Sequence, residues 1–450
     1  MQQQNKILLI TCIIVYLLYV IGYQNYWYLS IAIWSVSFVN LIKGYSNRIV
    51  FKDLLILLVI SKMLFAPAYF STLSNEEIFR VITVAHLPNE EYFQFALPAT
   101  LFFVFGLIVP LKRNDNHKEE INWSGILKND ERTKKQGVFL FITGILFSAI
   151  TAFFRIPGEF GFVFHVLSNL LFVGALYLMA YGYKNISSIY IGIIVFFGFI
   201  SGMAGKFIWP LFIFGMYFLP TLKIRFSFAK KLALIIPFVF FMMILQSVKM
   251  QYRNMVWGEN YSSFEKFNIY ADLISSQLTF SGAELKEPIN MLFERLDQGF
   301  LTYMAMEYVP SQEPFANGET IIESFFASFV PRFIWKDKPK AGGREMMEKY
   351  AGKKLLGSTS MNIGQFGEAY VNFGKIGGVF FLFVWALILN YFFYWFDKRS
   401  VMYPAILFWL PLFWTRGINA VGTDFATSFN TIVKTGIIVY FIHLYLKRMK

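Results

Sequence analysis

Residues 379–396 read VFFLFVWALILNYFFYWF, a run of 18 residues without a single charged side chain. A run of this length and composition is typical of a helix that crosses a lipid bilayer. Comparable stretches at 7–21, 27–42 and 437–446 are also nearly free of charge. Only 15% of the 450 residues are charged, against about 25% in soluble domains. The composition excludes an ordinary water-soluble enzyme and predicts an all-α protein that crosses the membrane several times.

Apolar stretches and the turn residues between them predict about twelve transmembrane helices. The predicted spans are 7–22, 27–42, 49–66, 95–111, 137–154, 162–181, 189–203, 207–220, 232–248, 374–396, 401–415 and 431–446. Two short spans, 189–203 and 207–220, have an alternative interpretation as a re-entrant pair around residues 201–206. The GxxxG spacing of Gly198 and Gly202 predicts close helix packing.

The distribution of Lys and Arg predicts the orientation of the chain. With a cytoplasmic N-terminus, the inner segments hold 21 Lys and Arg, whereas the short outer connections hold four. Positive charge is retained on the cytoplasmic side of membrane proteins, so both termini are expected there. The net charge of +13 then reflects topology and attraction to anionic membrane lipid, and no nucleic-acid partner is expected.

Histidine and cysteine are too few to suggest metal or thiol chemistry. The chain has four His and one Cys, Cys12, so no His/Cys cluster with zinc spacing and no intrachain disulfide is possible. No pair of carboxylates with metal-ligand spacing is evident either. We therefore expect neither a metal nor a cofactor.

The longest connection carries most of the charge outside the membrane. It covers 249–373, between the ninth and tenth spans, and divides the chain into 1–248, 249–373 and 374–450. The charge bias places it outside the cytoplasm. A connection of this length usually carries function, and its aromatic content argues against a disordered tether.

Within this segment, apolar residues between Ile321 and Ile334 recur in pairs every four residues. This spacing predicts a helix that lies along the membrane surface or packs back on the bundle. Pro331 ends or kinks it and is followed by Arg332, Trp335 and Lys338. Cations bind phosphate oxygens and aromatic rings stack on sugars, so this cluster suits a lipid diphosphate bearing a sugar. The alternative is that these side chains only anchor the segment at the interface.

Two strings in this region resemble a known family. They are Phe329-Val-Pro-Arg-Phe-Ile-Trp-Lys-Asp-Lys-Pro339 and Asn362-Ile-Gly-Gln-Phe-Gly-Glu-Ala-Tyr-Val-Asn-Phe-Gly374. Together with the layout of the spans, they are similar to the Wzy-type oligosaccharide repeat-unit polymerases, which assemble bacterial O-antigen and capsule. The resemblance implies a GT-C-like polymerase or ligase architecture in the bacterial inner membrane. It also implies a transfer of the growing glycan from undecaprenyl diphosphate to the next lipid-linked repeat unit.

The resemblance and the chemistry of that reaction nominate site residues. A diphosphate leaving group needs cations, and an acceptor hydroxyl needs a base. We expect Arg332 to clamp the diphosphate, Glu368 to act as the base, and Arg295 to assist; the alternative for Arg295 is an ion pair with Glu294 or Asp297. The expected substrate-binding residues are Lys338, Trp335, Lys206, Arg253, Tyr370, Asn372 and Arg416.

The expected partners are undecaprenyl-diphosphate-linked oligosaccharides and membrane lipid, with a chain-length regulator and a flippase as protein partners. Two other functions remain open. An O-antigen ligase shares the layout and differs in its acceptor. A flippase or transporter of lipid-linked sugars is disfavoured because Lys62 is nearly the only ionisable residue deep within a span.

Overall fold

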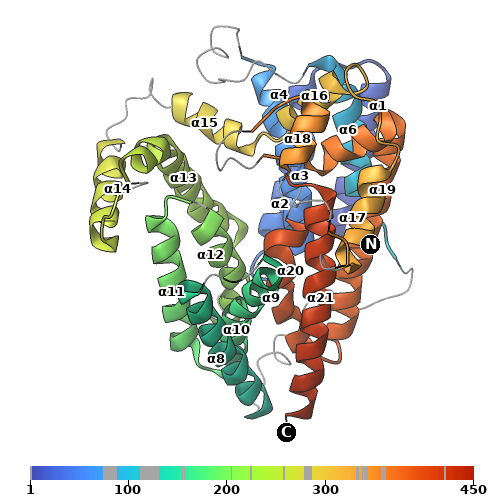
Figure 1. Ribbon diagram of the computed structural model, residues 1–450. Helices are drawn as coiled ribbons and strands as arrows, with labels where there is room; N and C mark the ends of the chain where they lie inside the picture. Colours follow the sequence, from blue (N-terminus) through green and yellow to red (C-terminus); the bar gives the residue numbers. More distant parts are fainter. Residues whose placement is uncertain are drawn as a thin grey trace.

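The computed structural model describes residues 3–73, 89–111, 131–154, 156, 158–203, 205–222, 226–256, 259–277, 286–330, 334–336, 338, 343–355, 361–419 and 422–449. This part of the chain consists of helices and connecting loops, without strands (Figure 1). The prediction of an all-α protein is confirmed for these residues.

Each of the twelve stretches predicted from the sequence coincides with one or more helices. The helices before residue 223 are α1 (Gln3–Val20), α2 (Tyr26–Gly44), α3 (Phe51–Ile60), η1 (Ser61–Phe65), α4 (Ala66–Phe70), α6 (Glu90–Ile108), α8 (Glu131–Phe153), α9 (Gly158–Ser168), α10 (Leu170–Tyr181), α11 (Lys184–Ile200), α12 (Gly205–Phe218) and η2 (Leu219–Leu222). Those after it are α13 (Phe228–Val256), α14 (Ser263–Gln277), α15 (Lys286–Leu296), α16 (Gly299–Tyr308), α17 (Glu319–Phe329), α18 (Arg344–Ala351), α19 (Gly364–Ser400), η4 (Pro404–Trp409), α20 (Leu410–Phe413), η5 (Trp414–Ile418) and α21 (Phe425–Arg448).

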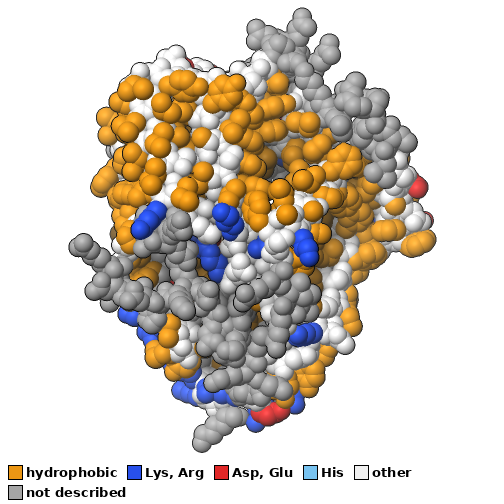
Figure 2. All heavy atoms as spheres, turned by 180° about the vertical axis from the view of Figure 1, so that it is seen from behind, with side chains coloured by type: hydrophobic (Ala, Val, Ile, Leu, Met, Phe, Trp, Pro, Cys, Tyr) orange, Lys and Arg blue, Asp and Glu red, His pale blue; other side chains and the backbone are white. Residues whose placement is uncertain are grey.

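Seven helical segments among the described residues are long and apolar enough to cross a membrane. They are Phe51–Phe70, Glu90–Ile108, Glu131–Phe153, Phe160–Tyr181, Phe228–Lys249, Gly364–Ser400 and Phe425–Arg448. Shorter apolar helices at Gln4–Val20, Lys184–Ile200 and Pro404–Phe413 occupy three further predicted spans. These helices indicate a membrane protein. Figure 2 shows one face of the molecule. Hydrophobic side chains cover much of its upper part, and Lys and Arg gather lower down.

The helices form two groups that contact each other where α13 packs against α2, α10 against η4 and α9 against α21. Figure 1 places α8–α14 on one side and α1–α4, α6, α16–α19 and α21 on the other, with α15 between the two groups. Within each group, the most extensive helix pairs are α10 with α8 and α19 with α6. Both groups therefore have their own apolar contacts.

Glycines allow the closest helix contacts. A Cβ on Gly144 of α8 would lie 2.2 Å from the backbone nitrogen of Leu171 in α10. A Cβ on Gly198 of α11 would lie 2.9 Å from the carbonyl carbon of Lys206 in α12. Small residues let membrane helices approach to this distance, so the close packing predicted at Gly198 is confirmed.

The segment 249–373 is largely helical and holds α14–α18. The predicted apolar stripe forms α17, which packs along α21, a helix apolar enough to cross a membrane. Its contact face carries small side chains, Ser324, Ala327 and Ser328, whereas Phe326 and Phe329 are each 54% exposed. Of the two predicted placements, α17 therefore takes the one against the bundle. Its Phe-rich face points outward.

Candidate functional site

Three basic side chains from two helices gather beside the end of a helix that is apolar enough to cross a membrane. Lys249 and Arg253 lie one turn apart near the C-terminal end of α13, and Arg295 lies in the last turn of α15. Their charges lie within electrostatic reach of one another. Burial, and then the neighbouring Arg295 guanidinium, lowers the pKa of Arg253 from its ordinary value. We call these three residues the cationic cluster.

Aromatic contacts hold α15 beside η1 and α4. The ring of Phe293 stacks on Tyr69 with centroids 3.9 Å apart, and it lies 5.4 Å from the ring of Phe65. The Tyr69 hydroxyl donates a hydrogen bond of 2.6 Å to Oδ1 of Asn290. Because α15 also packs against α13, it connects the two helix groups and fixes the position of Arg295 (Figure 1).

Two members of the cationic cluster, Lys249 and Arg295, have no carboxylate partner among the described residues. The ion pair of Arg295 with Glu294 or Asp297, the alternative expected from the sequence, is therefore not formed. Burial raises the pKa of Glu294, and the charge of Arg295 opposes this shift. Like charges held close together favour the binding of an anion.

Glu368 lies in a buried network and not on an open surface. Its side chain is 1% exposed. One carboxylate oxygen accepts a hydrogen bond of 2.8 Å from the Thr320 hydroxyl, and the other accepts one of 2.6 Å from the backbone N–H of Phe425. These contacts join α17, α19 and the start of α21. The arrangement suits a structural role, and the role of Glu368 as a base stays a prediction.

Asn372 belongs to the same network. Its amide donates hydrogen bonds of 2.7 Å to the Thr320 hydroxyl and 2.8 Å to the backbone oxygen of Glu368. It also accepts a bond of 3.1 Å from the backbone N–H of Gly318. Tyr370 points elsewhere and donates a bond of 3.2 Å to the backbone oxygen of Val309. The structure thus brings Asn372, but not the Tyr370 hydroxyl, to Glu368.

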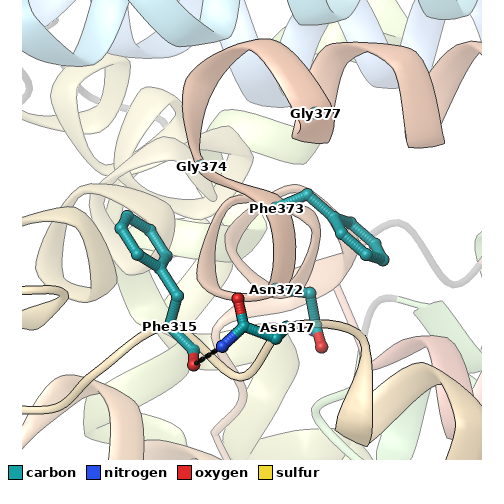
Figure 3. A pocket seen from close by; sticks show the side chains of 6 residues that line it. All are labelled: Phe315, Asn317, Asn372, Phe373, Gly374 and Gly377. Carbon is teal, nitrogen blue, oxygen red and sulfur yellow. Dashed lines mark hydrogen bonds between the residues drawn. The ribbon is translucent and has the colours of Figure 1, made fainter.

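A shallow pocket of about 370 Å³ lies beside this network, where α19 breaks at Gly374. Figure 3 shows the rings of Phe315 and Phe373 on opposite sides of the pocket and the amide of Asn317 below the break. The Asn317 amide donates a bond of 3.0 Å to the backbone oxygen of Phe315. Gly374 has a φ of +65°, which residues with a Cβ rarely adopt.

Lys206 lies at the start of α12 and lines a second pocket, of about 420 Å³. Lys338 follows α17, and its ammonium donates a bond of 3.0 Å to the backbone oxygen of Val330 at the end of that helix. Trp335 is half-buried. Arg332 lies outside the described residues, as does the side chain of Arg416, whose backbone is part of η5.

Two further residues bear on the site. The sequence pattern does not single out Lys249, because this residue ends an apolar run and so resembles a span boundary. Asp297, two residues after Arg295, is 3% exposed and accepts a bond of 2.7 Å from the N–H of Gly299. Burial raises the pKa of Asp297 to about 7. The described residues contain no group of three His, Cys, Asp or Glu side chains that would hold a metal.

Comparison with known proteins gives a family without an assigned activity. No curated protein and no solved structure matches the chain. A family model described as a domain of unknown function, DUF8712, matches residues 9–450. Since this match covers almost the whole chain, the protein belongs to the DUF8712 family.

Proposed function

We propose that the protein is a glycosyltransferase of the bacterial cytoplasmic membrane that polymerises the repeat units of a surface polysaccharide. Its substrates are oligosaccharides linked to undecaprenyl diphosphate. The growing glycan passes to the next lipid-linked repeat unit, and undecaprenyl diphosphate leaves. A flippase supplies the repeat units and a chain-length regulator acts beside the enzyme.

The cationic cluster carries this proposal. Lys249 and Arg253 extend a helix that is apolar enough to cross the membrane, and Arg295 joins them from a helix outside it. A diphosphate at the end of a lipid tail would lie at this boundary. Two guanidinium groups and one ammonium group match its negative oxygens.

The reaction requires few chemical groups. The bond between the anomeric carbon and the diphosphate oxygen breaks, and a new bond forms from the acceptor hydroxyl to the same carbon. Direct displacement inverts that carbon. The diphosphate leaves with the electron pair and needs cations and not a proton, while the hydroxyl proton passes to a carboxylate or to water. The strings at 329–339 and 362–374 support the same assignment through their resemblance to repeat-unit polymerases.

The test is the glycan ladder from cells that lack the protein, complemented with wild type, Arg253→Ala, Arg295→Ala or Arg332→Ala. Membrane abundance of each variant is measured in parallel. Lys230→Ala is the matched control, because Lys230 is an exposed lysine at the opposite end of α13. Deletion is expected to leave a single repeat unit on its acceptor. Arg295→Ala should do the same at normal abundance, and Lys230→Ala should restore the full ladder.

Other outcomes would replace the proposal. Full-length polymer that accumulates on undecaprenyl diphosphate in the deletion strain identifies a ligase. Repeat units that accumulate on the cytoplasmic face identify a transporter. Normal ladders from Arg253→Ala and Arg295→Ala would remove the cationic cluster from the active site.

A further inference from the structure

The Phe-rich face of α17 is largely uncovered by the described part of the chain. Ile322, Phe325, Phe326 and Phe329 have the i, i+3, i+4, i+7 spacing of one helix face. Ile322 is 57% exposed and Phe325 is 48% exposed, similar fractions to those of the other two. Residues 324–330 include no charged side chain. What covers this face depends on the depth at which α17 lies.

The start of α21 gives the reference for that depth. The ring of Phe425, in the first turn of α21, lies 5.5 Å from the ring of Phe381 and 4.9 Å from that of Trp385. One turn on, the ring of Phe429 lies 6.3 Å from that of Trp385. Phe381 and Trp385 belong to the uncharged run 379–396 of α19. The first turns of α21 therefore lie beside the first part of this apolar run.

α17 begins beside the first turn of α21 and runs along it. The Thr320 hydroxyl and the Phe425 N–H donate to the two oxygens of the same carboxylate, that of Glu368. Further along both helices, the ring of Phe325 stacks on that of Phe429 with centroids 5.7 Å apart. α17 therefore advances in the same direction as α21 (Figure 1). Its 11 residues extend by about 16 Å, about half the thickness of the apolar layer of a bilayer.

The uncovered face of α17 continues the exposed surface of α19. A Cβ added to Gly318 would lie 3.4 Å from the ring of Phe373 and 4.0 Å from the side chain of Ile322, so these two side chains are close neighbours. The ring of Phe373 lies 5.4 Å from that of Phe381, and Phe380 beside it is exposed. Exposed apolar side chains on a helix that can cross a membrane face lipid. One apolar surface therefore extends from α19 over α17.

The charged residues of α17 are confined to the end at which it begins. Its acidic residues, Glu319 and Glu323, lie near its start. The Glu319 carboxylate lies 3.8 Å from the ammonium of Lys349 in α18, and both side chains are at least half exposed. Because α18 follows α17 in the chain, the chain returns to the end from which α17 started. This path is typical of a segment that enters a membrane and leaves it on the same side.

Several polar groups of α17 are hydrogen-bonded without water. The hydroxyls of Ser324 and Ser328, on the face toward α21, donate to the backbone oxygens of Thr320 and Ser324. At the far end of the helix, the Lys338 ammonium donates to the backbone oxygen of Val330. Hydrocarbon offers no partner to such groups, so a helix within it must bond them internally. The bonds of α17 meet this condition at its contact face and at its far end.

We propose that α17 is a re-entrant helix, and that its exposed face, from Ile322 to Phe329, contacts the acyl chains of the bilayer. The segment enters the apolar layer at its acidic start and reaches about half-way across. Its exposed phenylalanines take the place that lipid-facing side chains have on α19 and α21. The proposal concerns the position of this segment and stands whether or not the protein polymerises glycans.

Spin labelling of the full-length protein in vesicles of phosphatidylethanolamine and phosphatidylglycerol tests the proposal. On a Cys12→Ser background, a nitroxide is attached at Phe326→Cys, at Ile437→Cys on the exposed side of α21, or at Glu313→Cys in the connection before α17. A label among acyl chains collides more often with oxygen than with a water-soluble nickel chelate, and a label in water shows the reverse. Phe326→Cys should give the high oxygen-to-nickel ratio of Ile437→Cys. Glu313→Cys should give a low ratio.

Two results would overturn the proposal. A ratio at Phe326→Cys as low as that at Glu313→Cys would place the face in water. Low collision rates with both reagents would show that protein covers it, and a dependence on the ratio of protein to lipid would identify a second copy of the chain. Phe329→Cys, one turn further into the membrane, provides the same measurement if Phe326→Cys fails to fold. Its ratio should exceed that of Phe326→Cys, because oxygen concentrates toward the centre of a bilayer.

Discussion

At the scale of single residues, Asp297 has the strongest consequence for pH dependence. Its pKa in the folded protein is about 7, raised from 3.8 by burial and opposed by hydrogen bonds from Gly299 and Phe300. Between pH about 4 and about 7, the folded state therefore holds a proton that the unfolded chain has released. Stability contributed by this residue falls as the pH rises through that window. The shift corresponds to at most about 4 kcal/mol.

Asp297→Asn should remove this dependence. An asparagine keeps an oxygen that accepts the two backbone N–H groups but carries no charge at any pH. We expect the variant to gain stability over wild type at pH 8 and to gain little at pH 5, measured as the thermal unfolding midpoint in detergent. Asp297→Ala is the control and should be less stable at both values, because it leaves two N–H groups without their acceptor. A gain that is equal at pH 5 and pH 8 would contradict the assignment.

The packing contacts of the predicted site residues do not follow from local sequence patterns. Arg253 and Arg295 are both predicted site residues, yet 41 residues separate them, and their meeting depends on the contacts of Phe293 with the rings of η1 and α4. No local sequence pattern predicts that packing. The burial of Glu368 was equally hidden, because a glutamate before a span is ordinarily hydrated and only the fold supplies Thr320 and the Phe425 N–H as donors.

At the scale of elements, long apolar runs are the most predictable feature. All twelve predicted stretches form helices, since a chain in lipid must satisfy its own backbone hydrogen bonds. The break within α19 at Gly374 falls at the predicted start of the tenth span. The sequence does not decide the placement of α17, because its stripe of Phe and Ile fits both a position along the membrane surface and packing on the bundle. Small side chains on its other face decide for packing on α21.

Glu368 connects three of these elements, and its substitution separates two roles. Glu368→Gln leaves one oxygen but turns an amide N–H₂ toward either the Thr320 hydroxyl or the Phe425 N–H, which both donate to the carboxylate. One lost bond at a buried donor costs about 1 to 3 kcal/mol. If Glu368 holds the helices together, we expect lower thermal stability and lower abundance with normal activity per molecule. Loss of activity per molecule at unchanged stability would instead identify it as the base. Lys375→Gln is the control, since that nearby lysine is partly exposed and its ammonium binds Gln94 and Glu91 of α6.

The contact between α8 and α10 gives a prediction about helix packing. Gly144→Ala places a methyl group 2.2 Å from the backbone nitrogen of Leu171, and backbone cannot move aside as a flexible side chain does. Overpacking of this kind destabilises by about 1 to 3 kcal/mol. We expect reduced membrane abundance and a lower unfolding temperature. Gly192→Ala is the matched control, because Gly192 lies in the apolar helix α11 with nothing within 4 Å of an added Cβ. Equal effects of the two substitutions would show that α8 and α10 do not pack this closely.

At the scale of the whole molecule, α15 lies between two helix groups, and the cationic cluster lies where α15 packs against α13 (Figure 1). The arrangement works only if the ends of α13 and α15 lie on the side of the membrane where the polymer is built.

The orientation of the chain is therefore the decisive prediction for the molecule as a whole. The bias of 21 to four Lys and Arg predicts that both termini lie in the cytoplasm and that 249–373 lies outside it. The chain has one cysteine, the buried Cys12, so Cys12→Ser gives a background with no other thiol. On that background, Glu313→Cys, between α16 and α17, should react with a membrane-impermeant maleimide in spheroplasts. Lys230→Cys, at the start of α13, should react only after the membrane is permeabilised. Both positions lie outside the most apolar part of their segments, so access to the reagent depends on the side of the membrane and not on burial in lipid.

The reverse labelling pattern would place the cationic cluster in the cytoplasm, where an external polymerase has no substrate. Labelling of both sites without permeabilisation would place both outside the cytoplasm. In that case α13 would not cross the membrane.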